Sequence, residues 1–375
     1  MDFNLTNEQQ LLRDGITKFL AARYHLETSR AAAKTGAGWQ PDIWRAFATE
    51  LGILGATLSE DVGGIGGGAV ELMVITEALG HALVIEPYID TVVVAGGLLR
   101  RAGGSAAVAV LKGIIAGTAV VALAAAEPDS ADRWQDVSTV ARPDGDGWVL
   151  NGSKIMVVGA PQATHLLVSA RTPGVDAISL FLTDSDSAGI EAHPYRTIDD
   201  RRAADIAFND LRLPSGALLG EQGRAWPSLA QARDEGAAAI CSEAVGCMRK
   251  VLADTVEYCK QRQQFGQPIG RFQVLQHRMV DMYMDLEQSV AAVYLAILNL
   301  EADDEVTRAR AVSVAKATIG RAARFIGQQA VQLHGGMGMT EELAIGHYFK
   351  RLTAIQYEFG TTDQHIARYA ELTKT

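Results

Sequence analysis

The hydrophobic period of this chain changes twice, and the two changes divide the chain into three regions. Up to about residue 115, apolar residues recur at helical spacing, as in Leu12, Ile16 and Leu20. Between about 119 and 219, short β-rich runs are separated by turn signals such as PDGDG, and from about 225 onward the helical spacing returns. This order predicts an α+β chain, mostly α, made of an N-terminal helical bundle, a middle β domain and a C-terminal four-helix bundle. The expected domain limits are 1–117, 118–222 and 223–375.

The helical regions contain recognisable helix starts and buried faces. Thr6 and Gln9 have the spacing of a capping box, in which each side chain accepts a hydrogen bond from a backbone N–H group at the start of a helix. In the last region Leu275, Met282 and Val293 fall on one stripe, which indicates a long helix with one buried face. The glycine-rich stretch between the first helices should be a loop. The other expected helices cover 40–51, 69–83, 225–261, 307–333 and 361–372.

The middle region should form an antiparallel sheet of barrel or sandwich type. Its strand-like runs follow one another without a long helical pattern between them, so the sheet is not expected to contain parallel crossover units. This excludes most doubly wound dinucleotide-binding folds. The string Gly64-x-Gly66-x-x-Ala69 resembles a nucleotide-binding fingerprint, but no buried strand precedes it and no βαβ unit follows it. We assign no function to it.

Charge and cysteine content exclude several classes of function. The formal net charge is -10, whereas proteins that bind nucleic acid or anionic membranes carry clustered Lys and Arg. The start of the chain lacks the apolar core of a secretory signal and no apolar run of about 18 residues occurs, so we expect a cytoplasmic protein without a membrane contact. Cys241, Cys247 and Cys259 have neither paired nor His spacing, which indicates buried thiols and no disulfide or metal site.

Two motifs in the last region are typical of a nucleotide site. The stretch YCKQRQQFGQPIGRFQVLQH places Arg262 at the end of one helical pattern, beside Phe265 and Gly266. An arginine there is a good clamp for a pyrophosphate, because the planar guanidinium pairs with two phosphate oxygens at once. Further on, QLHGGMGMT ends a helix in Gly335 and Gly336, where a backbone without Cβ can lie against a ligand.

The order and separation of these motifs resemble the C-terminal domain of the acyl-CoA dehydrogenases, flavoproteins that desaturate fatty acyl thioesters. The helical, β and helical order of the whole chain resembles the same family. The resemblance implies FAD as cofactor, an acyl-CoA as substrate and assembly into a tetramer. It also implies a set of residues that hold the ADP half of FAD, often the FAD of a neighbouring subunit. These residues are Arg262, Phe265, Gln273, Gln332, Gly335 and Gly336.

The resemblance is incomplete in the middle region, where family members hold the flavin ring with a Trp and a Thr on one strand. Lys154 is in register, but Met156 stands at the Trp position and Val158 at the Thr position. Upstream, the Thr-Glu-Pro and Gly-Ser-Asp residues of the family are replaced by AEPDSAD at 126–132. We therefore expect this region to keep its scaffold while losing part of the flavin contacts.

The glutamate that serves the family as catalytic base has no clear equivalent. It belongs to a Tyr-Glu-Gly-Thr sequence, and anchoring this chain on Gly360 and Thr361 places Phe359 at the glutamate position. Glu358 lies one residue away and would become the base only if Phe359 were an insertion. Glu358 is thus a weak candidate for the catalytic residue.

The second location that the family uses for the base, on the helix that opens the C-terminal domain, falls on Gly236. Glu235 is adjacent, but a shift of one residue turns a helical side chain by about 100°. Glu243 lies about two turns further along, and we expect it to be a carboxylate buried against an arginine or a helix dipole. Both base positions are therefore expected to be empty.

A chain that keeps the ADP clamp but lacks the base resembles the smaller, non-catalytic subunit of heteromeric bacterial acyl-CoA dehydrogenases. Some of these enzymes act on bulky or unusual thioesters, such as those of steroid side chains or dicarboxylates. We expect a heterotetramer in which a homologous subunit supplies the glutamate. Two alternatives stay open: a homotetrameric dehydrogenase that uses Glu358, and a redox-inactive scaffold that binds acyl-CoA or a protein. The sequence does not identify the acyl group.

Overall fold

The computed structural model describes residues 4–130, 133–173 and 175–374, without the side chains of 175 and 176. The chain folds into two compact units. One combines the residues up to Leu26 with Gly68–Val84 and with everything from Ala237 onward. The other combines Glu27–Gly67 with Ile85–Gly236. Some of the N-terminal helices thus belong to one unit and some to the other. The hydrophobic period had instead predicted one N-terminal helical domain.

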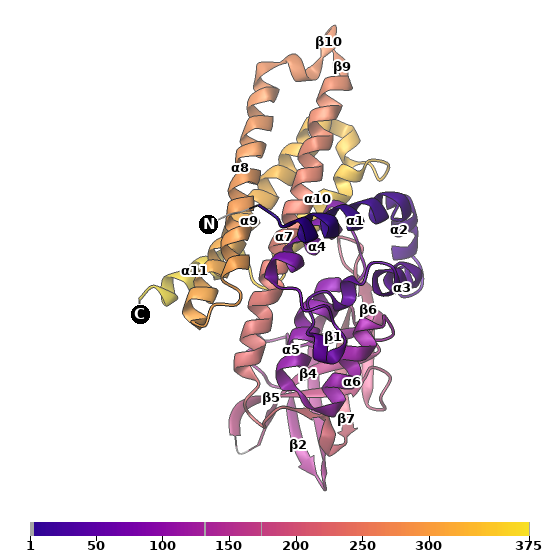
Figure 1. Ribbon diagram of the computed structural model, residues 1–375, viewed down its shortest axis with the longest axis vertical. Helices are drawn as coiled ribbons and strands as arrows, with labels where there is room; N and C mark the ends of the chain where they lie inside the picture. The colour runs from indigo at the N-terminus through magenta and orange to yellow at the C-terminus, as the bar shows by residue number, and fades with distance from the viewer. Residues whose placement is uncertain (1–3, 131–132, 174, 375) are drawn as a thin grey trace. The chain divides into compact units, whose positions relative to one another are not determined.

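The first unit is helical, and several of its helix starts follow from the local sequence. Thr6 and Gln9 form the expected capping box of α1, and Thr361 forms a second one at α11. The carboxylate of Asp304 accepts hydrogen bonds from the first free N–H groups of α9. A short hairpin joins α7 to α8 (Figure 1). The elements are α1 (Asn7–Arg23), α4 (Ala69–His81), α7 (Trp226–Gln261, from Ala237 in this unit), β9 (Gln263–Gln264), β10 (Gln267–Pro268), η6 (Ile269–Arg271), α8 (Gln273–Leu298), α9 (Glu305–His334), η7 (Gly335–Met339), α10 (Ala344–Ile355) and α11 (Thr362–Leu372).

Two glycines let α4 and α7 pack closely. A Cβ added at Gly246 would lie 1.9 Å from the carbonyl oxygen of Glu77, and one added at Gly80 would lie 2.0 Å from that of Glu243. The Sγ of Cys247 lies 3.1 Å from the carbonyl oxygen of Gly80. The three cysteines are buried thiols that form no disulfide, as predicted. Small residues therefore set the distance between these two helices.

The second unit contains an eight-stranded sheet among its described residues, in the order β6-β7-β3-β2-β4-β5-β8, with β1 paired to β4. Most pairings are antiparallel, as predicted, but β1–β4 and β2–β4 are parallel. The expectation of a purely antiparallel sheet was wrong at these two places, because the β2–β3 hairpin provides the crossover that a helix usually supplies. The strands are β1 (Val121–Ala124), β2 (Val140–Asp144), β3 (Gly147–Val158), β4 (His165–Thr172), β5 (Val175–Asp184), β6 (Ile190–Arg196), β7 (Arg202–Leu213) and β8 (Leu218–Leu219).

Short helices complete the second unit, and side chains such as Leu150, Phe181 and Phe208 form the core of its sheet. The glycine-rich stretch between α3 and α4 is a loop with two single-turn helices, as predicted. No helix in the described ranges is long and apolar enough to cross a membrane. The helical elements are α2 (Leu26–Ala33, from Glu27 in this unit), α3 (Pro41–Thr49), η1 (Ile53–Gly55), η2 (Glu60–Val62), the π-helix η3 (Ile89–Ala95), α5 (Gly96–Ala102), α6 (Gly104–Ile115), η4 (Ala160–Gln162) and η5 (Ser215–Ala217).

Candidate functional site

The hairpin between α7 and α8 holds Phe265 in an unusual backbone conformation. Phe265 and Gly266 form its two-residue loop, with φ of 54° and 77°. Positive φ at both positions is typical of a type I′ turn, which favours Gly, Asn or Asp and rarely accepts a bulky side chain. The Phe265 ring is 90% exposed, and its centroid lies 6.0 Å from that of Phe272. An exposed aromatic ring at a strained position does little for folding, which favours the predicted ligand contact.

The charge around this hairpin is positive in a chain that is otherwise acidic. Residues 258–280 contain Lys260, Arg262, Arg271 and Arg278 and no Asp or Glu, whereas the whole chain has a net charge of -10. Arg262 directly follows α7, and its N–H donates to the carbonyl oxygen of Tyr258 at 2.8 Å. Its side chain is exposed, and no described residue pairs with the guanidinium. An anionic ligand is the natural partner of such a cluster.

The glycine pair at the end of α9 leaves an open surface. Gly335 has φ of 59°, which ends the helix, and a Cβ added at Gly335 or Gly336 would meet no atom within 4 Å. The preceding His334 is buried and stacks on Tyr258, with ring centroids 4.2 Å apart. Burial lowers the pKa of His334, so the imidazole is neutral at pH 7. His334 thus packs inward while the two glycines face solvent.

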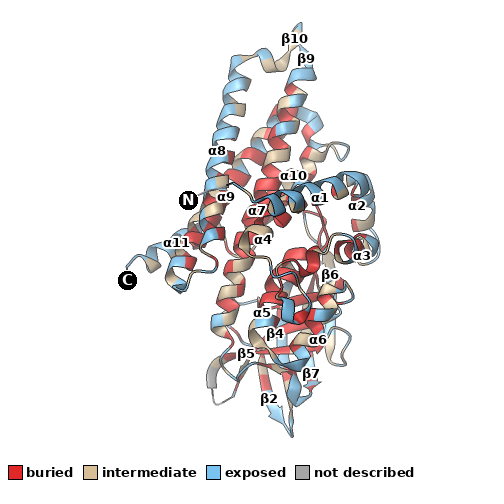
Figure 2. Ribbon diagram, in the orientation of Figure 1, coloured by how far each residue is buried: buried red, intermediate tan, exposed pale blue. Residues whose placement is uncertain are grey.

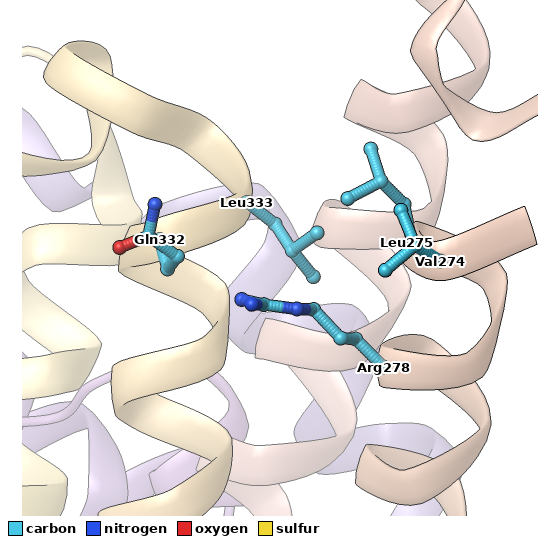
Figure 3. A pocket seen from close by; sticks show the side chains of 5 residues that line it. All are labelled: Val274, Leu275, Arg278, Gln332 and Leu333. Carbon is cyan, nitrogen blue, oxygen red and sulfur yellow. The ribbon is translucent and has the colours of Figure 1, made fainter. Parts of the chain in front are cut away.

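A pocket of about 210 Å³ lies between α8 and α9 (Figure 3). Of the six predicted cofactor residues, Gln332 lines this pocket, while Gln273 is the first residue of α8, next to it. Arg262 and Phe265 lie in or beside the hairpin. Sequence reasoning missed Arg278, although an arginine in an acid-free stretch just after Gln273 was a usable signal. The lining residues are Val274, Leu275, Arg278, Gln332 and Leu333.

The candidate base Glu358 is engaged in an ion pair. Arg351 is 3% exposed and donates through Nη1 and Nη2 to the two carboxylate oxygens of Glu358. It also donates to both carboxylate oxygens of Glu243, at 2.6 and 3.0 Å. The expectation that Glu243 is buried against an arginine is therefore confirmed. One guanidinium thus holds both carboxylates, and neither is presented freely to a substrate.

Two more buried side chains fix the loop that carries Glu358. Lys316 donates to the carbonyl oxygens of Ile355 and Gly360, at 3.0 and 2.7 Å. The Nε2 of His365 lies 2.9 Å from the carbonyl oxygen of Phe359. Phe359 itself has φ of 56°. The loop conformation is thus set by charged and polar groups that contact its backbone.

The second base position is also without a carboxylate side chain. Gly236 lies within α7, and the adjacent Glu235 accepts a hydrogen bond from Arg101 at 2.7 Å and one from Gln231 at 3.0 Å. A Cβ added at Gly97 would lie 2.6 Å from Glu235 Oε2, so the glycine makes room for this carboxylate. Glu235 is thus occupied by interactions within the second unit.

The strand that would hold a flavin ring is distorted at Met156. A β-bulge between Lys154 and Val157 gives Met156 a φ of 52° and leaves its side chain 53% exposed. Its backbone N–H donates to Asp205, and its Sδ accepts from the Tyr195 hydroxyl at 3.1 Å. Neither Met156 nor Val158 supplies an N–H or O–H side-chain donor to a ligand. Ala131 and Asp132 of the replaced loop lie outside the described residues.

The scaffold below this strand is held by a buried ion pair. The Lys154 ammonium is fully buried and donates to Glu127 at 2.7 Å, to Ser169 at 3.0 Å and to a backbone carbonyl. Glu127 also accepts the N–H groups of Ser138 and Thr139. Burial lowers the pKa of Lys154 to about 8. The pair therefore ties four segments together, which agrees with the expectation that this region keeps its scaffold.

Comparison with known proteins identifies the family. Models of the N-terminal, middle and C-terminal domains of acyl-CoA dehydrogenases match residues 6–118, 122–211 and 223–372. Acyl-CoA dehydrogenase FadE12 of Mycobacterium tuberculosis is 29% identical over 355 residues, which cover 91% of this chain and 89% of the relative. The Tcur3481-Tcur3483 steroid ACAD variant is 28% identical, with a TM-score of 0.88 and 98% of both chains covered. The FAD complex of PigA is 25% identical, with a TM-score of 0.91, and covers 100% of this chain and 99% of its own.

These matches confirm the predicted fold class and FAD as the predicted cofactor. The helical, β and helical order of the elements agrees with the domain matches, which extend over nearly the whole chain. The chain belongs to the acyl-CoA dehydrogenase family.

Proposed function

We propose that this chain is the partner subunit, without a catalytic base, of a heterotetrameric FAD-dependent acyl-CoA dehydrogenase. The observation that carries this proposal is the shared guanidinium of Arg351, which binds both Glu243 and Glu358. Desaturation requires a carboxylate that removes a proton next to the thioester carbonyl. Both carboxylate oxygens of Glu358 and both of Glu243 are engaged by this guanidinium and so are not free to approach that proton. A homologous subunit would therefore supply the glutamate.

The role of this chain toward the cofactor is binding and orientation. FAD, when bound, accepts the hydride from the carbon next to the one that loses the proton. The exposed hairpin and the open end of α9 would hold the ADP half, because they combine unpaired positive charge with uncovered backbone. Met156 and Val158 would leave the flavin ring without the hydroxyl contact that the family uses. The proposed binding residues are Arg262, Phe265, Gln273, Gln332, Gly335 and Gly336.

A second apolar face on α8 supports a subunit partner. The inner face of this helix contains Met282, Leu286 and Val293, which are buried. On the opposite face Val280, Met284, Leu295 and Leu298 are 43 to 55% exposed and recur at helical spacing. Figure 2 shows exposed segments, in pale blue, along α8. A helix that is apolar on two faces normally has both covered. A homologous chain would cover the outer face in the proposed tetramer, which we place in the cytoplasm.

Two observations support a proposed substrate class. Family members act on acyl-CoA thioesters, and a structure 28% identical to this chain is named as a steroid ACAD. We extend the proposal to a bulky acyl-CoA, such as one derived from a steroid or another lipid.

The test is to express the chain alone and together with a homologue that carries the glutamate. We expect the chain alone to reduce no FAD when an acyl-CoA is added, and the co-expressed assembly to be yellow and active. If the chain alone binds FAD stoichiometrically and reduces it with an acyl-CoA, it is a homotetrameric dehydrogenase and the proposal fails. A colourless co-expressed assembly would instead support the alternative that this chain is a redox-inactive scaffold.

A further inference from the structure

We propose that Met156 is a site of oxidation by peroxides and that Tyr195 positions the oxidant beside its sulfur. The product is a methionine sulfoxide, a modification that methionine sulfoxide reductases reverse. The proposal goes beyond the proposed function, because it requires neither FAD nor a second subunit. It rests on the side chains of Met156, Tyr195 and Asp205, which all belong to the second compact unit.

The β-bulge in β3 fixes the place of the Met156 side chain. Two residues of β3, Ile155 and Met156, stand opposite the single residue Asp205 of β7. Met156 has φ of 52°, which a residue with a Cβ rarely adopts. Asp205 Oδ1 accepts the N–H of Met156 at 3.0 Å and so stabilises this conformation. The thioether therefore leaves the sheet at a defined position, and Met156 is 53% exposed.

Tyr195 brings a hydroxyl group to this sulfur. Asp205 pairs with His193 across β6 and β7, so Tyr195, two residues further along β6, lies on the same face of the sheet. Its hydroxyl oxygen lies 3.1 Å from Met156 Sδ and 2.9 Å from Asp205 Oδ1. The hydroxyl has one proton for these two acceptors, and a carboxylate accepts more strongly than a thioether. The lone pairs of the hydroxyl oxygen therefore remain available beside the sulfur.

The protonation state of Tyr195 suits it to bind a peroxide. Burial, the hydrogen bond to Asp205 and the charge of that carboxylate raise the pKa of Tyr195 to about 12, so the phenol is neutral at pH 7. A phenol that donates to Asp205 can accept a hydrogen bond from the O–H group of a peroxide. Because the hydroxyl oxygen and Sδ are 3.1 Å apart, a peroxide bound in this way has one oxygen in contact with the sulfur.

The oxygen transfer balances with the thioether and the peroxide alone. A lone pair of Sδ attacks the nearer peroxide oxygen, so that an S–O bond forms and the O–O bond breaks. The sulfur is oxidised by two electrons. The proton of the transferred oxygen passes to the leaving oxygen, and the peroxide is reduced to water, or to an alcohol if it is organic. The sulfoxide makes this side chain polar and a stronger hydrogen-bond acceptor.

Exposure alone predicts a different order of oxidation among the methionines. Met339 is 71% exposed, whereas Met156 is 53% exposed. Within the described ranges, no hydroxyl group donates a hydrogen bond to the sulfur of Met339, so it lacks the positioning group that Met156 has. Tyr195 therefore predicts that Met156 is oxidised faster than the more exposed Met339.

The experiment treats the purified full-length chain with hydrogen peroxide and follows the sulfoxide at each methionine by peptide mass spectrometry. In the wild type we expect Met156 to be oxidised about threefold faster than Met339, the reference within the same molecule. Tyr195→Phe removes only the hydroxyl, so the rate of Met156 should fall to that of Met339 or below. Tyr369→Phe is the matched control, because Tyr369 is a 40% exposed tyrosine on α11, and it should keep the wild-type ratio. Circular dichroism verifies that each variant is folded.

Two outcomes would overturn the proposal. If Met156 in the wild type is oxidised no faster than Met339, exposure sets the order and the hydroxyl has no positioning role. If Tyr195→Phe keeps the wild-type ratio of the two rates, another feature of the bulge causes the reactivity. The proposed function is judged separately, by the flavin content and activity of the co-expressed assembly.

Discussion

Arg351 binds the carboxylate of Glu358 through two guanidinium nitrogens, and this pair decides how the loop after α10 can act. Both residues belong to the first compact unit, seven positions apart in the chain. The same guanidinium holds Glu243 from α7, so two carboxylates share one cation. Such a group stabilises the loop and at the same time engages the carboxylate of Glu358 that proton transfer would need.

The first prediction concerns Glu358 in the active assembly. Because its charge serves the ion pair, Glu358→Gln should leave kcat of the co-expressed enzyme within about twofold of the wild type. If Glu358 were the base, the same substitution would lower kcat by at least about 100-fold. Steady-state kinetics with an acyl-CoA and an electron acceptor distinguishes the two. If Glu358→Gln abolished turnover without affecting folding, the result would support the alternative in which Glu358 is the base of a homotetrameric dehydrogenase.

Arg351 should matter for stability. Arg351→Met removes the guanidinium that binds Glu243, whose side chain is 4% exposed, so the free energy of unfolding should fall by about 3–5 kcal/mol. The matched control is Arg249→Met, which removes the more exposed pair with Glu77 and should cost at most about 1 kcal/mol. Urea denaturation followed by circular dichroism measures both. Equal losses in the two variants would contradict the role assigned to Arg351.

The Lys154–Glu127 pair predicts a dependence of stability on acid. Burial alone would raise the pKa of Glu127, but Lys154 and the amides of Ser138 and Thr139 bring it below the ordinary 4.5. Between these two values the unfolded state binds more protons, so the stability from Glu127 is present above pH 4.5 and is lost as pH falls through the lower, folded pKa. The free energy of unfolding, measured by denaturation at several pH values in this range, should therefore fall more steeply with decreasing pH for the wild type than for the double variant Glu127→Gln with Lys154→Met. If the free energy of unfolding of the double variant had the same pH dependence as that of the wild type, Glu127 would not be its source.

Phe265 predicts opposite effects on folding and on cofactor retention. Phe265→Gly removes the strain of a positive φ, so stability should stay equal or rise by up to about 1 kcal/mol. The same change removes an exposed ring from the hairpin, so the assembly should bind FAD about tenfold more weakly. Leu11→Ala, which removes another exposed apolar side chain, should change neither quantity. Equal FAD affinity in Phe265→Gly and the wild type would exclude Phe265 from the cofactor site.

The local sequence predicted much of the fold because its signals act over a few residues. The capping box of Thr6 and Gln9, the stripe on α8 and the glycine-rich loop before α4 all depend on neighbours within one or two helical turns. The parallel pairing of β1 with β4 could not be predicted in this way. It joins strands that are about 40 residues apart. The hydrophobic period of one strand does not specify which distant strand pairs with its edge.

The sequence by itself determined the class of this protein: its helical, β and helical order, its acidic charge, and an acid-free segment between Tyr258 and Val280 beside a glycine pair. Only the tertiary structure decided what the charged residues do. It joined Arg351 to a glutamate 108 residues away and placed Arg278 across a pocket from Gln332. The physical reason is that periodicity and capping are properties of one segment, whereas the availability of a buried charge depends on which segments pack around it.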